Sequence, residues 1–426
     1  MKRKQIYILT ALTLTFCTAN AQKTYTLDDC RSMALQNNLK LKNSQLDVDM
    51  AIQGKKEAFT GYFPTISAGG TIFQGFNNLL QADMEMAQTK VPLSAIKKGA
   101  MASVMAVQPI FTGLRIINGN KLAQIQHDAS LLKKQMTEKE VIQKTVDYYW
   151  QIASLKGKME TMQSADKQLE EVYRQVDLSV KAGLTTRNDL LRIELRRQEL
   201  SGNMLEIENN IKTVKMMLAQ HMGIPRDSFD IEVKSFYNPE APYKFYTDPQ
   251  NAAITRQEYR LSQINTEACG YEVKMERGKN MPTVSIGIGD MYYNLMDKNV
   301  NNGVVFATVS IPISSWWGGS HSIAKAKIKQ VQAQNVQRET EELLAIDVEQ
   351  AWNKLTEAYA QIDIARHSVE SATENLRLNK EYFKAGTTTL TDLLDAESLL
   401  TESRNKLTSA CTDYMCKLSN YKLKTE

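Results

Sequence analysis

The 426-residue chain has few of the features that mark an enzyme or a metalloprotein. It contains no phosphate-binding loop, no Gly-x-Ser-x-Gly elbow and no His-Glu-x-x-His motif. Gly287-Ile-Gly289 lacks the third glycine and the following helix of a dinucleotide site, and is typical of a strand instead. We therefore expect no catalytic activity, no cofactor and no bound metal. The four histidines, which lie too far apart for a metal-ligand spacing, are His127, His221, His321 and His367.

An excess of one charge and long apolar runs are missing too. The formal net charge is +4, and Lys2, Arg3 and Lys4 supply three of these charges, which leaves about +1 (4 − 3) without them. No strong attraction to nucleic acid is expected at this charge. Beyond the N-terminus, no stretch reaches the roughly 18 apolar residues that a transmembrane helix needs. If a chain without such a helix is exported, as the N-terminus described next indicates, it is expected to be either soluble or a β-barrel.

The N-terminus has the pattern of an export signal. A basic start is followed by a mostly apolar run from Ile6 to Phe16 and by Ala19-Asn20-Ala21, a small-x-small cleavage site. The apolar run is too short for a membrane anchor, which is the alternative. We predict that residues 1–21 are a secretory signal peptide.

Four cysteines follow the predicted signal. An even number in an exported chain can indicate disulfides. Cys411 and Cys416, however, are five residues apart in a helical stretch and do not share a face. We expect Cys30, Cys269 and this pair to be buried free thiols, because free cysteine behaves as a small apolar residue.

The chain repeats part of its own sequence. Lys181-Ala-Gly-Leu-Thr-Thr-Arg-Asn-Asp-Leu-Leu191 recurs as Lys384-Ala-Gly-Thr-Thr-Thr-Leu-Thr-Asp-Leu-Leu394, an offset of 203 residues (384 − 181). The same offset relates Pro109-Ile110 to Pro312-Ile313, and Phe63-Pro-Thr-Ile-Ser67 resembles Met281-Pro-Thr-Val-Ser285. Such repeats indicate structurally equivalent halves. We place them at residues 22–248 and 249–426.

Each half is predicted to contain one long helix and two short ones. From about Ser320 to Ala385 there is no proline or glycine, and apolar residues recur at steps of four and three, as in a coiled-coil seam. Such a helix of about 65 residues would be about 100 Å long. The alanines in the seam predict close packing against neighbouring helices. The seam residues are Leu344, Val348, Ala351, Leu355, Ala358, Ile362, Ala365, Val369, Ala372 and Leu376.

The other predicted helices follow the same plan in both halves. Short helices are expected over about 251–278 and 389–423 in the second half. The first half should have a long helix over about 116–181 and short helices over about 27–60 and 188–221. Its seam is less regular, because Thr145 and Asp166 stand where the second half has Val348 and Val369.

Alternating segments predict two strands in each half. Residues 282–293 and 303–313 alternate apolar and small or polar residues over nearly the 9 to 11 residues that a tilted strand needs to cross a bilayer. Taken alone, each strand could equally belong to a soluble hairpin. In the first half the extra residues 76–98, with Met84, Met86 and Pro92, are expected to form a longer surface-exposed loop. The aromatics at the strand ends, as in the girdles of membrane interfaces, are Tyr62, Phe63, Tyr292, Tyr293, Trp316 and Trp317.

Four strands cannot close a membrane barrel by themselves. The smallest single-chain barrels have about eight strands, and lipid does not tolerate an open sheet edge. Several copies related by closed rotational symmetry should therefore share one barrel. The predicted fold class is α+β: long coiled-coil helices that form an α-barrel, with four transmembrane β-strands per chain that complete a shared 12-strand β-barrel in a trimer.

The repeated tips, of the form Ala-Gly-x-x-Thr-x-x-Asp-Leu-Leu, and the x-Pro-Thr-x-Ser strand starts resemble those of the TolC-like outer-membrane factors, or outer membrane efflux proteins. The resemblance covers essentially Tyr25 to Leu423. It implies a homotrimeric channel in the outer membrane of a Gram-negative bacterium that extends into the periplasm, with residues 225–248 around its equator. Such a channel is the exit duct of a tripartite efflux pump or a type I secretion system.

The implied partners are outer-membrane lipid, a periplasmic adaptor protein and an inner-membrane transporter. The duct itself passes cargo passively, and drugs, metal ions and secreted proteins all fit the resemblance. An alternative function is a periplasmic coiled-coil protein that bridges envelope layers without transport.

The resemblance also assigns roles to the repeated tips. Gly183, Leu184 and Thr185, with Gly386, Thr387 and Thr388, would dock the adaptor. The two glycines are placed for turns with positive φ, and simple helix capping is the alternative role.

The acids that follow the tips would form the periplasmic gate. Asp392 and Asp395 lie three apart on one helix face, so a trimer would carry two rings of carboxylates, which raise one another's pKa and attract cations. Acids that complement a helix dipole are the alternative. Asp189 corresponds to Asp392, but Arg192 corresponds to Asp395.

One position departs from the family. Some members place an arginine two residues after the second-tip glycine, where it ties neighbouring helices shut, and this chain has Thr388 there. A pair between Arg187 and a carboxylate could replace that latch.

Overall fold

A computed structural model describes residues 23–425 except 87–88, 226–228, 234 and 296–297, with the backbone alone described for 23, 80–86, 89–95 and 298. The predicted signal peptide, 1–21, lies outside the described residues. Contacts divide the chain into two compact units. Unit 1 combines the residues up to 43 with 135–256 and 343 onward, and unit 2 combines 44–134 with 257–342. Each unit thus draws on both sequence repeats, whose boundaries stay a prediction.

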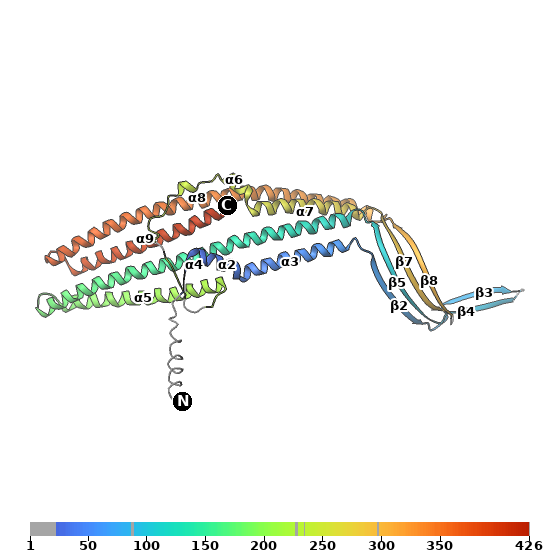
Figure 1. The fold of residues 1–426 in the computed structure, drawn as a ribbon, viewed down its shortest axis with the longest axis horizontal. Coiled ribbons are helices and arrows are strands. Elements are labelled where there is room, and N and C mark those ends of the chain that lie inside the picture. The colour runs from blue at the N-terminus through green and yellow to red at the C-terminus, as the bar shows by residue number, and fades with distance from the viewer. Residues whose placement is uncertain (1–22, 87–88, 226–228, 234, 296–297, 426) are drawn as a thin grey trace, which may run out of the picture. The chain divides into compact units, whose positions relative to one another are not determined.

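Unit 1 is built mainly from helices that pair as hairpins. In Figure 1, α4 lies beside α5 and α8 lies beside α9, and each pair is joined by a short turn. The predicted long helices and the two short helices that follow them are confirmed. The helices with residues in this unit are α2 (Leu27–Asn37), α3 (Leu39–Thr60), α4 (Arg115–Lys181), α5 (Arg187–Met222), α6 (Pro249–Thr255), α8 (Ser315–Lys384) and α9 (Leu390–Thr425).

The predicted seam of α8 is the buried face of that helix. Nine of its ten residues are buried and Val369 is half-buried. The polar exceptions in the first half have partners. Thr145 is fully buried and its hydroxyl donates to Val141 O (2.8 Å), while Asp166 accepts from Arg197 Nε (2.8 Å). Because these hydrogen bonds satisfy the polar groups, the less regular seam still packs.

The short opening helices are not continuous, and in this respect the predictions over 27–60 and 251–278 were wrong. The first is broken at Asn38, whose Oδ1 accepts from Lys40 N (2.9 Å) and Leu41 N (3.3 Å) and so caps α3, while its Nδ2 donates to His221 O (2.8 Å). The second is broken at Arg256, which separates α6 from α7 (Gln257–Lys279). At each break the side chain of the interrupting residue also binds a residue distant in sequence: Asn38 binds His221, and Arg256 binds Asp347.

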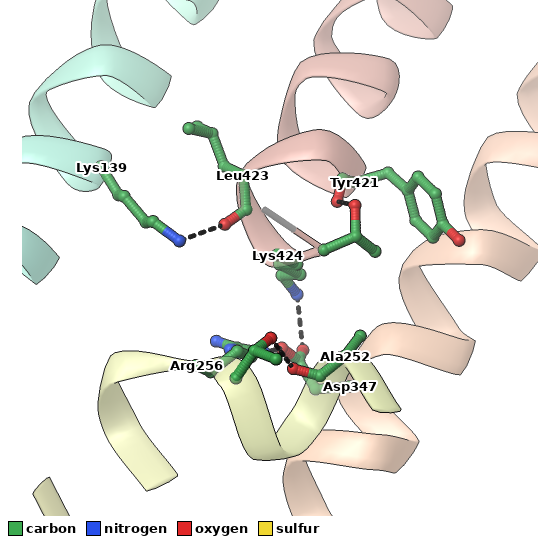
Figure 2. A network of polar contacts seen from close by, with 9 residues as sticks. Lys139, Ala252, Arg256, Asp347, Tyr421, Leu423 and Lys424 are labelled. Carbon is green, nitrogen blue, oxygen red and sulfur yellow. Dashed lines mark hydrogen bonds and ion pairs between the residues drawn. The ribbon is translucent and has the colours of Figure 1, made fainter. Parts of the chain in front are cut away.

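A network of ion pairs surrounds the second break. Figure 2 shows Asp347 of α8 together with Arg256 Nη1 (2.8 Å) and Lys424 Nζ (2.6 Å). Lys139 Nζ of α4 donates to Leu423 O (3.0 Å) beside them. The C-terminal end of α9 is thereby fixed to α8 and α4.

The first half has a similar arrangement in the segment 225–248. This segment contains β6 (Phe229–Ile231), which pairs in parallel with β1 (Lys23–Tyr25), and a short 3-10 helix, η1 (Pro242–Phe245). Asp230 lies between Lys156 Nζ (2.6 Å) and Lys215 Nζ (2.7 Å). A carboxylate held by two cations therefore occurs in each half. The four cysteines are free thiols, as expected, although Cys416 is only half-buried.

Unit 2 contains an antiparallel four-stranded sheet in the order β2-β5-β7-β8. Figure 1 shows these strands side by side. The strand predicted at 303–313 begins and ends earlier in the structure. The edge strands β2 and β8 have no further partner among the described residues. The strands are β2 (Thr65–Gln74), β5 (Lys98–Phe111), β7 (Thr283–Leu295) and β8 (Lys298–Ser310).

The extra residues of the first half form a hairpin rather than the predicted loop. Strands β3 (Leu80–Met86) and β4 (Thr89–Ala95) pair antiparallel from Leu80↔Ala95 to Met86↔Thr89. The hairpin forms because paired strands satisfy backbone groups that a loop would leave to water.

One face of the four-stranded sheet is apolar and exposed. The register places Val309 opposite Val284 and Val305 opposite Ile288, so their side chains share a face. Val305 is 78% exposed. The opposite face carries Ser285 and Thr308 together with larger apolar residues such as Met105 and Phe306. The apolar set on the first face is Ile66, Ala68, Val104, Ala106, Val284, Ile286, Ile288, Val305, Ala307 and Val309.

None of the described helices has both the length and the apolar composition needed to cross a membrane.

Candidate functional site

The two repeated tips have the same backbone geometry. Gly183 and Gly386 have φ values of 71° and 73°, in the left-handed region that favours glycine. Leu184 N donates to Ser179 O (2.8 Å) and Thr387 N donates to Tyr382 O (2.9 Å), at equivalent positions after each long helix. Both long helices therefore end in a Schellman-type turn that satisfies their last carbonyl groups.

The helices that leave the tips begin with equivalent capping boxes. In the first tip, the Thr186 hydroxyl donates to Asp189 Oδ2 (2.9 Å) and accepts from Asp189 N (3.4 Å). In the second, Thr389 does the same with Asp392, at 2.6 and 3.2 Å. Each box is completed by the backbone: Thr186 N donates to Asp189 Oδ2 (3.4 Å) and Thr389 N donates to Asp392 Oδ2 (3.1 Å). Backbone donors that every helix start leaves open are thereby satisfied.

A second threonine binds each capping carboxylate. Thr185 Oγ1 donates to Asp189 Oδ2 (2.7 Å), and Thr388 Oγ1 donates to Asp392 Oδ2 (2.9 Å). Thr388, which stands where some family members have arginine, therefore makes its side-chain hydrogen bond within its own tip.

These hydrogen bonds change the acidity of both carboxyl groups. The hydroxyl and backbone N–H of Thr389, with Thr388, lower the pKa of Asp392. Thr185 is the main cause of the lowered pKa of Asp189. Within one chain the direction for Asp392 is opposite to the rise expected from clustered carboxylates, because the hydroxyl groups stabilise the ionised form.

Asp395 has a different environment from Asp392. It is exposed, one turn further along α9, and has no ion-pair partner in the described part of the chain. Its counterpart Arg192 donates to Thr391 Oγ1, which links α5 to α9. Arg187 is exposed and forms no ion pair with any described residue, so within one chain the substitute latch is absent.

The tip residues are open to solvent. Leu184 is 81% exposed, and Gly183, Gly386 and Thr387 are exposed. Thr185 and Thr388 are half-buried. The first tip thus presents a protruding leucine, and the second carries three successive threonines, Thr387 to Thr389.

Sequence reasoning missed one acid near the tips. Glu397 of α9 is only 4% exposed and lies among the buried residues Leu393, Ala396 and Leu400. The sequence could have indicated its burial. Residues three and four positions apart share a helix face, and the helix face that carries Glu397 is otherwise mostly apolar. No group of three or more His, Cys, Asp or Glu residues suited to a metal ion occurs in the described ranges.

The chain is similar to known proteins of one family. The sequence profile of the outer membrane efflux protein family matches residues 30–223 and 249–415. Outer membrane protein TolC of Salmonella enteritidis is 21% identical over 413 residues, 91% of this chain and 79% of that protein. Outer membrane efflux protein BepC of Brucella suis is 21% identical over 388 residues, 90% of this chain and 81% of that protein.

A solved structure has a similar fold. The outer membrane channel CmeC of Campylobacter jejuni superposes with a TM-score of 0.77 at 14% identity, covering 94% of this chain and 85% of that one. Because the family profile spans most of the chain and both repeated tips, this protein belongs to the outer membrane efflux protein family.

Proposed function

We propose that three copies of this chain form the outer-membrane exit duct of a tripartite efflux pump or type I secretion system. The duct has no chemistry of its own. It passes cargo that an inner-membrane transporter and a periplasmic adaptor deliver. The observation that carries the proposal is the four-stranded sheet of unit 2, whose exposed face is apolar and whose edge strands are unpaired among the described residues.

The sheet suits a membrane only if copies complete one another. An exposed face with Ile66 (72%) and Val305 (78%) is stable against lipid chains rather than water. The edges β2 and β8 each present a row of backbone donors and acceptors, which lipid cannot satisfy. Pairing β8 of one copy with β2 of the next closes twelve strands in a trimer.

The two exposed tips are proposed as the adaptor-docking surface. Gly183, Leu184 and Thr185 form the first tip, and Gly386, Thr387 and Thr388 form the second. Their equivalent turns present two similar surfaces per copy. A trimer would therefore offer six related docking positions to adaptor hairpins.

The acids after the tips are proposed as the periplasmic gate, with unequal parts. Asp392 and Asp189 are bound to threonines, so their charge is held at the helix start. Asp395 is exposed and has no ion-pair partner among the described residues, so it is free to face the axis of a trimer. A ring of three such carboxylates attracts cations.

Conductance in a planar lipid bilayer tests the proposal. The purified protein should conduct ions with a preference for cations, and Asp395→Asn should weaken that preference. Asp363→Asn, an exposed acid on α8, is the matched control and should leave it unchanged. If neutralising Asp392 and Asp395 together still gave no conductance, the bridging function without transport would be favoured.

A further inference from the structure

Glu397 is a buried acid that the present arrangement does not satisfy. Thr401 Oγ1 donates to its Oε1 (3.1 Å), while Oε2 is buried and has no hydrogen-bond partner among the described residues. An ionised carboxylate in such a place is costly. A glutamate at this position therefore does not stabilise the arrangement of helices seen here.

In the first repeat, the acid equivalent to Glu397 does have a hydrogen-bond donor from a neighbouring helix. Glu194 is the equivalent residue (397 − 203), and Tyr173 OH donates to its Oε1 (3.1 Å). The residue equivalent to Tyr173 in the second half is Leu376, which is buried and cannot donate. The second half has thus kept the acid without its donor.

A second unpaired group lies on the neighbouring helix. Arg196 of α5 donates through Nη2 to Ser398 Oγ (2.6 Å) and through Nη1 to Glu199 Oε2 (2.5 Å). Its Nε is buried with no partner in the described chain. The Arg196–Ser398 bond joins α5 to α9, and the charge of Arg196 acts on Glu397. A cationic donor and a carboxylate acceptor, both incompletely used, therefore lie on two helices that are in contact.

The other charged groups near Glu397 are already engaged or lie on its own helix. Lys380 of α8 donates to Gln168 Oε1 of α4 (2.9 Å), and Arg404 lies two turns along α9. On α4, the acids Asp166 and Glu170 face Arg197. Among the cations whose charge acts on Glu397, Arg196 is the one on another helix that has a buried donor without a partner among the described residues.

We propose that Glu397 and Arg196 are the two parts of a latch between α9 and α5, which is unpaired here and closes when Glu397 ionises. Closing requires a small shift of α9, the helix that carries Asp392 and Asp395, so the latch sets the position of the gate. The inference rests on the proposed channel function. The Glu397–Arg196 pair would link two helices of one chain, a link that Thr388 does not provide.

The direction of the pH effect follows from burial. Desolvation raises the pKa of Glu397, against the opposing charges of Arg196, Lys380 and Arg404. Below that pKa the carboxyl group of Glu397 is neutral and costs little to bury, so low pH stabilises the unpaired arrangement. As the pH rises through it, the carboxylate requires a partner and the paired arrangement gains. Thr401, which binds Glu397, and Arg196 both line an open cavity of about 700 Å³.

Single-channel recording between pH 5 and pH 8 tests the latch. The open probability of the native trimer should change across this range, and Glu397→Gln should show the acidic value at every pH. Arg196→Gln removes the partner of the carboxylate, so this variant should also show the acidic value at every pH. A purely structural role for Arg196 would leave the pH dependence of the open probability in place. Glu194→Gln is the matched control and should keep the native profile.

The possible failures are distinguishable. A conducting trimer whose pH profile is the same with Glu397→Gln overturns the latch and leaves the channel function intact. An absence of conductance in the native protein overturns the channel function on which the latch rests. Thermal melting gives an independent readout: relative to Glu397→Gln, the native protein should lose stability as the pH rises from 5 to 8, and a constant difference would also contradict the latch.

Discussion

At the scale of single residues, the tip glycines hold a backbone conformation that other residues disfavour. No described atom lies within 4 Å of a Cβ added at Gly183 or Gly386, so only the positive φ opposes a side chain. Either glycine→alanine substitution should destabilise the protein by about 1 kcal/mol. Urea unfolding of the detergent-purified protein would measure this.

The control for this prediction is Gly202→Ala. Gly202 also has an open Cβ position but lies inside α5. Alanine there should stabilise the protein by about 1 kcal/mol, because glycine is the poorer helix former. Equal effects at all three positions would contradict the backbone explanation.

Asp347 gives a residue-scale prediction about pH. Burial opposes its ionisation, but hydrogen bonds from Lys424 and Arg256 outweigh this and lower the pKa. Such a group contributes stability above its unfolded pKa of about 3.9, and the contribution is lost as the pH falls through the folded value. Asp347→Asn should therefore lower the melting temperature at pH 7, with the difference closing below about pH 4.

The matched control is again on α8. Asp363 is more exposed than Asp347, and Arg366 Nη1, its arginine partner, is 3.9 Å away. Asp363→Asn should stay within about 0.5 kcal/mol of the native protein at both pH values. A loss as large as that of Asp347→Asn would show that net charge, rather than the network in Figure 2, is responsible.

Residue-scale prediction from sequence succeeded where the chemistry is local. The positive φ of Gly183 and Gly386 follows from a glycine between a helical pattern and a polar turn. The use of Asn38 at a helix break does not, because it depends on His221, which is 183 residues away. The proposed roles of Asp392, Asp395 and the tips stay predictions.

At the scale of elements, the alternation of alanine with larger residues along α8 predicts close helix packing. Ala358 is 6% exposed within this seam. Ala358→Leu should destabilise the protein by about 1 to 3 kcal/mol, because added methylene groups force shifts in a packed interface. Lys354→Leu, an exposed site on the same helix, should have little effect on the melting temperature. If both variants melted alike, the seam would not be closely packed.

The elements that sequence missed were those with a weak or non-local signal. A 3.6-residue period over 60 residues accumulates, so α4 and α8 were predictable from pattern alone. The period-two alternation of Leu80, Ala82, Met84 and Met86 was present but spans only seven residues. Interruptions by one residue, as at Arg256, leave the periodic pattern almost unchanged and depend on partners such as Asp347.

At the scale of the whole molecule, the two faces of the sheet should respond differently to charge. Val305→Arg places a cation on the apolar face proposed to contact lipid, and should cost about 2 to 4 kcal/mol near the bilayer midplane. Thr308→Arg lies on the opposite face of the same strand and should be tolerated. Recovery of folded protein in outer-membrane fractions would measure both. Equal recovery would contradict the proposed orientation of the sheet.

The most direct test of the account is electron microscopy of the protein extracted from membranes in detergent. We expect a particle with threefold symmetry and a detergent belt around a closed twelve-strand barrel. A monomer that stays in solution without detergent would contradict it, because the apolar face and the open edges of the sheet would then have no partner.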